Sequence, residues 1–207
     1  MDNIRHHKNS IKVYGTGYLE AAPDIATIYM SVITQGEDVV ATQNDNNKIT
    51  TNVIKQLRSL GVPMSNIETI NYSVSPIYEY IDNKQVFKGY KVKNTLAVKT
   101  TELNQVGTII DKSIAAGVNS VSTINYDLSD IRCHYQEALR LALIDAKDKA
   151  YVIASTICVL LNDTPYQVNE LIDKSQVYQM ESRSYEATPI IPSKIQIRAN
   201  VEVYFNY

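Results

Sequence analysis

Side chains that could act as nucleophiles, bases or metal ligands are few in this sequence, and they are poorly placed to act together. Cys133 and His134 are neighbours early in a predicted helix. Adjacent helical side chains point about 100° apart, so these two are badly oriented for a thiolate–imidazole pair or a shared metal ion. His6 and His7 fall in a polar N-terminal arm, residues 1–10. We therefore interpret Cys133 as a small apolar helix residue.

Sequence motifs of the common enzyme classes are absent. There is no HExxH, CxxC, GxSxG or phosphate-loop spacing. Gly15-Thr16-Gly17 lacks the third glycine and the following helix of a dinucleotide-binding motif, and a bent strand explains it better. The carboxylates nearest to the ends of predicted elements are typical turn or cap residues: Asp24, Asp111, Asp127 and Asp130. We predict that the protein is not an enzyme and has neither a cofactor nor a metal ion.

One surface feature stands above this background, a predicted hairpin at residues 78–99 that interleaves aromatic and basic side chains. It could stack on single-stranded nucleic acid and neutralise it. It could also be a strand edge that lysines protect from unwanted pairing, or a protein–protein contact rich in tyrosine. The candidate contact surface consists of Tyr78, Tyr80, Tyr90, Lys91 and Lys93.

Composition favours a folded protein without a basic field. The chain has 207 residues, of which 44% are hydrophobic and 20% charged, which is ordinary for a globular protein with a real core. A net charge of −2 argues against a dedicated nucleic-acid binder, because binding would need a local basic patch. Fifteen tyrosines against two phenylalanines and no tryptophan suit a surface made for contact.

Targeting signals are also absent from the sequence as written. No window approaches the run of about 18 apolar residues that crosses a bilayer, and the opening MDNIRHHKNS has no apolar signal-peptide core. A cytoplasmic location is expected for this sequence. If a leader has been removed from the natural protein, a periplasmic or cell-surface location is expected instead.

The hydrophobic pattern predicts an α+β fold with long strands and three helices. Strands at 11–20 and 25–34 are interpreted as a hairpin, and a helix follows at about 39–60. Its N-terminal half, 42–48, is nearly all amides and charges and is expected to project beyond the sheet or to be solvated on most sides. Further strands are predicted at about 69–76, 90–99, 120–128, 166–172 and 194–205. Further helices are predicted at about 103–117 and 130–159.

Small residues recur at two places where close packing is expected. Gly15 and Gly17 occupy inward positions of the first strand, so something packs tightly over it. The long helix carries an alanine at every fourth position, which would let it approach a neighbouring surface closely: Ala138, Ala142, Ala146, Ala150 and Ala154.

The order β-β-α-β-β-α-β-α-β-β, dominated by hairpins, predicts a mostly antiparallel sheet with about three helices packed on one face. We assign residues 11–207 to a single domain. The stretch 175–193 has no regular hydrophobic period and is predicted to be a long loop within that domain.

The ordered residues resemble the SIMPL domain family, also called DUF541, from about Ile11 to Phe205. The matching pieces are Val13-x-Gly15-x-Gly17, Pro23-Asp24-x-Ala26, Asn71-x-Ser73-x-Ser75-Pro76-x-Tyr78-x-Tyr80, Gly89-Tyr90, Asn94, Ile110-Asp111, Ala116-Gly117-x-Asn119, Leu128-Ser129-Asp130 and Asp145-Ala146-Lys147-x-Lys149-Ala150. The resemblance implies an α+β protein without an established enzymatic activity or catalytic residues. Bacterial members are mostly exported and are linked to oxidative-stress tolerance.

The resemblance also implies self-association, because one member, an outer-membrane-associated antigen, assembles into a large ring-like or channel-like oligomer. Two features depart from the family: the missing leader, and Cys158 to Asn162, where relatives commonly end the long helix with a glycine. The second departure predicts a different helix terminus. We predict a non-enzymatic, self-associating protein, with an unidentified protein partner as a further expectation; the alternative is a nucleic-acid-binding module that uses hairpin 78–99.

Overall fold

The computed structural model describes residues 9–171 and 193–207. Most of the polar arm 1–10 and of the predicted loop 175–193 therefore lies outside the described residues. The chain divides into two compact units. The terminal unit contains the first strand, the last helix and the last two strands, and the central unit contains the elements between them. The assignment of residues 11–207 to one domain stays a prediction.

The terminal unit is a three-stranded antiparallel sheet with one helix on it. Its strands lie in the order β1-β7-β6. The twelve pairs between β1 and β7 run from Ser10–Asn206 to Ala21–Ile195. The alternating apolar side chains of the last strand are buried, as the sequence predicts. The elements are β1 (Ser10–Ala21), α3 (Ile131–Thr156), β6 (Gln167–Glu170) and β7 (Ile195–Asn206).

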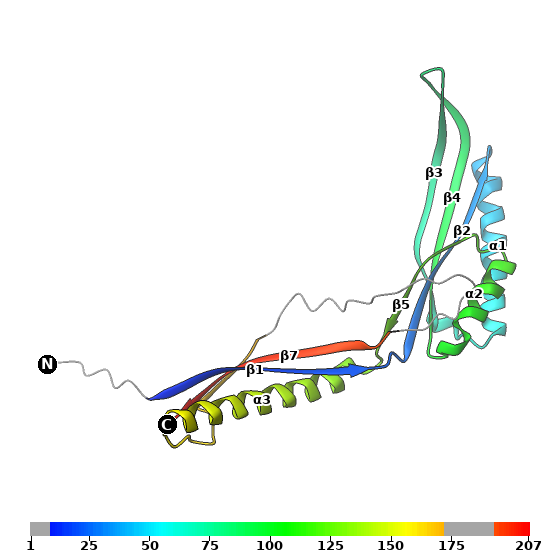
Figure 1. The fold of residues 1–207 in the computed structure, drawn as a ribbon. Helices are drawn as coiled ribbons and strands as arrows, with labels where there is room; N and C mark the ends of the chain where they lie inside the picture. Colours follow the sequence, from blue (N-terminus) through cyan, green and yellow to red (C-terminus); the bar gives the residue numbers. More distant parts are fainter. Residues whose placement is uncertain (1–8, 172–192) are drawn as a thin grey trace. The chain divides into compact units, whose positions relative to one another are not determined.

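The alanine ridge of α3 packs directly on the glycines of β1. All five alanines of the ridge are buried, and α3 runs along one face of β1 and β7 (Figure 1). A Cβ atom added to Gly15 would lie 2.0 Å from the carbonyl oxygen of Ala142, and one added to Gly17 would lie 2.0 Å from that of Ala138. The two predictions of close packing are thus confirmed as the two sides of one contact.

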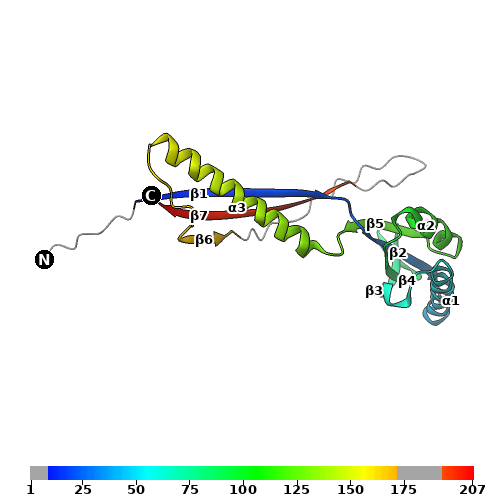
Figure 2. The same ribbon diagram turned by 90° about the horizontal axis from the view of Figure 1, so that it is seen from below.

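The central unit is a four-stranded antiparallel sheet in the order β3-β4-β2-β5. Helices α1 and α2 lie on the same face of it (Figures 1 and 2). Short 3₁₀ turns at Met64–Asn66 and Leu103–Gln105 precede β3 and α2. The elements are β2 (Ile25–Gly36), α1 (Val39–Ser59), β3 (Ile67–Ile81), β4 (Lys84–Thr100), α2 (Val106–Ala115) and β5 (Ser120–Asp127).

The α+β class and the antiparallel pairing are confirmed, but the pairing of the first two strands is wrong. Strand β1 pairs with β7, whereas β2 pairs with β4 and β5. The strands consequently form two sheets instead of one. The segment Ala21-Ala22-Pro23-Asp24 connects a strand of one sheet to a strand of the other and does not close a hairpin. The strand that pairs with β1 is β7, at the opposite end of the chain, and its alternation of apolar and polar residues matches that of β1.

The N-terminal half of α1 is solvated on most sides, as expected, but two of its polar residues are buried. Thr42 and Asn46 are buried on the same face of the helix as the apolar residues Val53 and Leu57. The buried stripe of α1 is therefore polar in its N-terminal half. The Asn46 side chain donates hydrogen bonds to the carbonyl oxygens of β2 and β4, so the helix is held to the sheet by polar contacts where apolar residues are missing. A pattern of hydrophobic residues alone cannot reveal such a polar stripe.

The end of α3 has the geometry that glycine usually provides, with a cysteine in the glycine position. Cys158 has a φ of 58°. Its N–H donates to Ser155 O, and Val159 N–H donates to Ala154 O, which is the Schellman arrangement. The prediction of a different helix terminus is therefore wrong: the terminus is the usual one and the residue type is unusual.

Replacing this cysteine should stabilise the protein. We expect Cys158→Gly to raise the free energy of unfolding by about 1 kcal/mol, because a left-handed conformation is costly for a residue with a Cβ atom. Denaturant unfolding followed by circular dichroism measures the change. Cys158→Ala is the matched control, since it removes the thiol but keeps the Cβ and should give no comparable gain. A gain of the same size for alanine would mean that the thiol, not the backbone, is responsible.

Candidate contact surface

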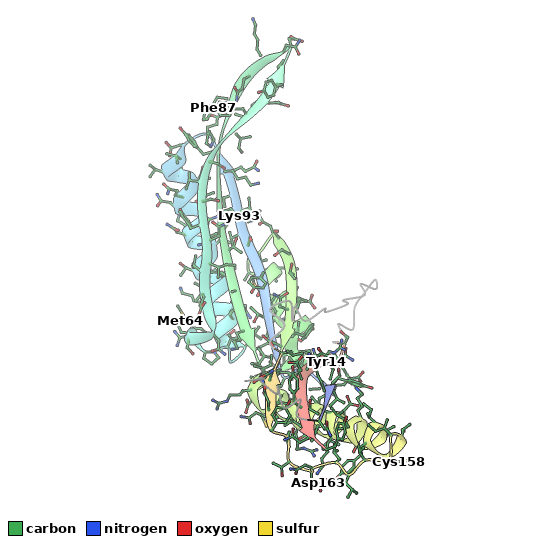
Figure 3. The ribbon with its side chains drawn as sticks, turned by 90° about the vertical axis from the view of Figure 1, so that its left-hand side faces the viewer. Tyr14, Met64, Phe87, Lys93, Cys158 and Asp163 are labelled. Carbon is green, nitrogen blue, oxygen red and sulfur yellow. The ribbon has the colours of Figure 1, made fainter. Side chains whose placement is uncertain are left out.

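The hairpin of β3 and β4 extends past the rest of its sheet. The two strands pair as far as Ile81 and Lys84, whereas β2 leaves β4 at the Gly36–Tyr90 pair. Beyond Tyr90 the hairpin is therefore a two-stranded ribbon, which projects past β2 and α1 (Figures 1 and 3). Asp82 and Asn83 close it with φ angles of 50° and 60°, as in the tight turns that favour these residue types.

Aromatic side chains of the ribbon gather on one face. Tyr78 pairs with Phe87 across the strands, and their ring centroids lie 5.8 Å apart. Phe87 also makes an edge-to-face contact with Tyr90 at 5.2 Å. Tyr80 falls on the same face by alternation and is 74% exposed. Three of the five predicted site residues, Tyr78, Tyr80 and Tyr90, thus share a face. Phe87, at the centre of the cluster, is not among the predicted site residues.

The two predicted lysines lie on the other face. Lys91 and Lys93 alternate with Tyr90 and Val92 along β4, and their cross-strand partners in β3 are Ser75 and Ser73. Because β4 is an internal strand between β3 and β2, these lysines do not border an edge of the sheet. The interpretation that they protect a strand edge is wrong for these two lysines, whereas Lys84 and Lys88 lie in the part of β4 that β2 does not cover.

The outer edges of β1 and β3 differ in whether side chains bond to their outward backbone groups. At β1, Thr16 N–H donates to Asp145 Oδ2 at 2.8 Å, and Lys149 Nζ donates to Tyr14 O at 2.9 Å, so α3 satisfies two outward backbone groups. Burial would raise the pKa of Asp145, but the hydrogen bonds from Lys149 and Thr16 hold it below its ordinary value.

No such contact reaches the backbone edge of β3 within the described residues. Several large apolar side chains of β3 are exposed instead: Ile70, Tyr72, Val74, Tyr78, Tyr80 and Ile81. A bulge at Ile70 and the missing N–H of Pro76 interrupt this edge but leave the stretch between them open to pairing. The exposure on both faces is not visible in the sequence, because alternating patterns suggest one buried face.

Within residues 9–171 and 193–207, no hydrogen bond joins a cysteine side chain to His134. Cys133 and Cys158 are exposed and free, so the interpretation of Cys133 as a buried apolar residue is wrong. The ring of His134 is hydrogen-bonded to Asp130 O. As predicted for a cap residue, Asp130 accepts from the N–H of Cys133 at the start of α3. Among the described residues no three His, Cys, Asp or Glu side chains gather as a metal site would require. None of the described helices is long and apolar enough to span a membrane.

A cavity of about 520 Å³ lies at the C-terminal end of α1, in the size range of small-molecule sites. Its charged lining residues are Lys99 and Glu102, and neither cysteine nor histidine contributes to it. The described lining thus contains no cysteine–histidine or serine–histidine pair of the kind that covalent catalysis uses.

Comparison with known proteins gives a family and several bacterial relatives. Residues 11–205 match the SIMPL family, described as a protein of unknown function (DUF541). The 26 kDa periplasmic immunogenic protein of Brucella melitensis is 32% identical over 149 residues, which are 70% of this chain and 60% of that protein. The uncharacterized protein YggE of Escherichia coli K12 is 24% identical over 68% of this chain and 57% of its own length.

A third relative, YggE of Edwardsiella ictaluri, is 24% identical over 84% of this chain and 73% of its own length. The chain therefore spans about three fifths of the Brucella and Escherichia proteins that it matches. The relatives' names mention neither a reaction nor a ligand.

Proposed function

Because the chain belongs to the SIMPL (DUF541) family, whose function is unknown, we propose a role that needs no catalytic site: a non-enzymatic interaction protein that associates with further copies of itself. The observation that carries the proposal is the exposed aromatic ribbon of β3 and β4. Tyr78, Tyr80 and Tyr90 are the proposed contact residues, with Phe87 at their centre.

The ribbon is an unfavourable structure for an isolated molecule. A two-stranded hairpin without a third strand or a covering helix is marginally stable in water. This one also exposes Tyr80 and about half of both Tyr78 and Phe87. Tyrosine and phenylalanine are enriched in protein interfaces, where burying their rings provides much of the binding energy. A second copy packed on the ribbon would remove this apolar surface from water.

The contrast between the two edge strands supports the same role. Side chains of α3 occupy the edge of β1, which keeps another strand from pairing there. Across the part of the chain that the structure describes, no side chain occupies the edge of β3 between its bulge at Ile70 and Pro76. An exposed strand edge next to exposed aromatic residues is suited to pairing with another strand.

The alternative of a nucleic-acid-binding module fits this geometry less well. Binding of single strands combines stacking on aromatic rings with neutralisation of phosphates in one groove. Here Tyr78 and Tyr90 lie on the face opposite to Lys91 and Lys93. One strand of nucleic acid lying on the aromatic face would not reach these two lysines.

Light scattering coupled to size exclusion tests the proposed association. We expect the wild-type chain to show a mass above that of the 23.3 kDa monomer, rising with concentration. The triple variant Tyr78→Ser, Tyr80→Ser, Phe87→Ser should weaken association by at least tenfold, roughly the cost of losing a central aromatic contact. Circular dichroism confirms that the sheet is retained.

Lys91→Ser with Lys93→Ser is the matched control on the opposite face of the hairpin and should leave the mass unchanged. A wild-type chain that stays strictly monomeric across a wide concentration range would contradict the proposal. Salt-sensitive retention of single-stranded oligonucleotides that the lysine variant abolishes would instead favour the nucleic-acid alternative.

The location belongs to the proposal as well. The Brucella relative is periplasmic by name, and we extend that location to this chain in place of the cytoplasm. The link to stress tolerance stays a prediction that rests on resemblance.

A further inference from the structure

A second exposed surface lies on the terminal unit, independent of the β3–β4 hairpin. It is the face of the β1-β7-β6 sheet opposite to α3, and we call it the open sheet face. Gly15 and Gly17 point towards α3, so the side chains between and beside them point to the other side. Among the described residues no helix or strand packs on that side. The face is formed by Tyr14, Thr16, Tyr18, Asn200, Glu202 and Tyr204.

Two of its tyrosines are accessible to a ligand. Tyr14 is 53% and Tyr18 63% exposed, although both lie in the middle of a regular strand (Figure 3 shows Tyr14). Tyr14 and Tyr18 are four residues apart, which corresponds to about 13 Å along the strand. Thr16 lies between them and pairs across the sheet with Asn200. The face therefore alternates broad apolar rings with polar groups.

The polar groups of the face are held in fixed positions by one another. Lys12 forms an ion pair with Glu202, and its Nζ lies 5.0 Å from the ring centre of Tyr14 and 5.5 Å from that of Tyr204. Asn169 of β6 donates to Glu202 Oε2 at 2.9 Å. Hydrogen bonds from Lys12 and then Asn169 lower the pKa of Glu202 to about 2, so this carboxylate is a permanent acceptor at neutral pH.

Two more polar side chains complete the arrangement. Thr16 Oγ1 donates to Asn200 Oδ1 at 3.1 Å, so the amide NH₂ of Asn200 takes no part in this hydrogen bond and can donate to a ligand. Fixed donors and acceptors between exposed aromatic rings are characteristic of a surface prepared for a polar ligand, since little entropy is lost when it binds.

Most of the charges on the open sheet face are paired within it. Lys12 pairs with Glu202, and Glu20 lies 3.5 Å from Lys194. Arg198, which lies opposite Tyr18, makes a further interaction. A polyanion such as a nucleic acid would have to compete with these carboxylates for the cations. A protein partner would bury the paired charges and lose their hydration. An uncharged ligand rich in hydroxyl groups does not compete for the cations, and its hydroxyl groups replace the water hydrogen bonds that it displaces.

We propose that the open sheet face binds a neutral, extended β-linked glycan. A pyranose ring has C–H faces that pack on tyrosine rings, and hydroxyl groups at its rim that bond with carboxylates and amides. The distance between Tyr14 and Tyr18 exceeds the width of one sugar ring, so a chain of sugars is needed to contact both. β-1,4-linked chains are extended ribbons that can follow a strand from Tyr14 to Tyr18, whereas α-linked glucans coil away from it.

Native gel electrophoresis through hydroxyethyl cellulose, with calorimetric titration of cellohexaose, tests this binding on the full chain. We expect the polysaccharide to retard the protein and dextran, which is α-linked, to leave its mobility unchanged. Tyr14→Ala and Tyr18→Ala should each weaken cellohexaose binding about tenfold, the effect of losing one aromatic stacking contact. Both side chains are exposed, so circular dichroism should show an unchanged fold.

Tyr80→Ala on the β3–β4 hairpin is the matched control and should bind cellohexaose like the wild type. This control also separates the two proposals, because it affects association but not glycan binding. No retardation by hydroxyethyl cellulose would overturn the inference. So would undiminished binding by the double variant Tyr14→Ala, Tyr18→Ala, or a preference for anionic polymers that disappears with added salt.

Discussion

Gly17→Ala is expected to lower the free energy of unfolding by about 3 kcal/mol, the upper range for overpacking a core. The added Cβ would lie 2.0 Å from the carbonyl oxygen of Ala138 and 2.5 Å from the amide nitrogen of Ala142. Both are backbone atoms in the middle of α3, which cannot rotate away as a flexible side chain can. The helix would have to lift from β1, and the contacts of the other buried alanines would loosen with it. Urea unfolding followed by circular dichroism measures the loss.

Gly107→Ala is the control for this substitution. Gly107 lies in α2, and a Cβ added there has no atom within 4 Å. Alanine favours a helix, so this variant should gain about 0.5–1 kcal/mol. If Gly17→Ala stayed within about 0.5 kcal/mol of the wild type, a typical value for surface changes, the close contact between β1 and α3 would be refuted.

The contact between β1 and α3 shows what the sequence can predict. Glycines at two inward strand positions require a close neighbour, and alanines at every fourth helix position provide a surface that can come close. Each pattern is local and could be interpreted alone. That the two patterns meet is a matter of tertiary structure, because Gly17 and Ala138 are far apart in the chain and only the fold brings them together.

Strand pairing shows where sequence reasoning fails. Consecutive strands often form hairpins, which is why strands 11–20 and 25–34 were expected to pair. The turn residues between them allow a hairpin but do not require one. The competing partner of β1, the last strand, offers twelve matched positions with strict alternation, and long-range pairing of that kind leaves no signal in the intervening sequence.

The candidate contact surface was predicted from residue types alone. In the structure its tyrosines and its lysines lie on opposite faces of the hairpin. Tyr90 and Lys91 are adjacent in sequence, yet successive residues of a strand point to opposite faces. The alternation of β4 could be predicted from its apolar residues. The position of β4 inside the sheet, which removes the lysines from any edge, depends on the pairing with β2 and could not be predicted.

The polar stripe of α1 leads to the second large expected effect, at Asn46. This side chain is fully buried, and its Nδ2 donates to Val32 O at 3.0 Å and to Val92 O at 3.4 Å. Its Oδ1 accepts from Thr50 Oγ1 at 3.4 Å. We expect Asn46→Ala to lower the free energy of unfolding by about 2–3 kcal/mol, because it leaves buried polar atoms without a partner and opens a small cavity.

Two further variants separate the causes of that loss. Asn47→Ala changes the exposed neighbour on the same helix and should cost nothing, since alanine is the better helix former. Asn46→Leu keeps the branching at Cγ in a larger side chain but removes the hydrogen bonds. If the bonds hold α1 to β2 and β4, leucine should destabilise about as much as alanine, by about 2 kcal/mol. A leucine variant as stable as the wild type would show that α1 needs only packing at this position, and the polar stripe would then have no structural role.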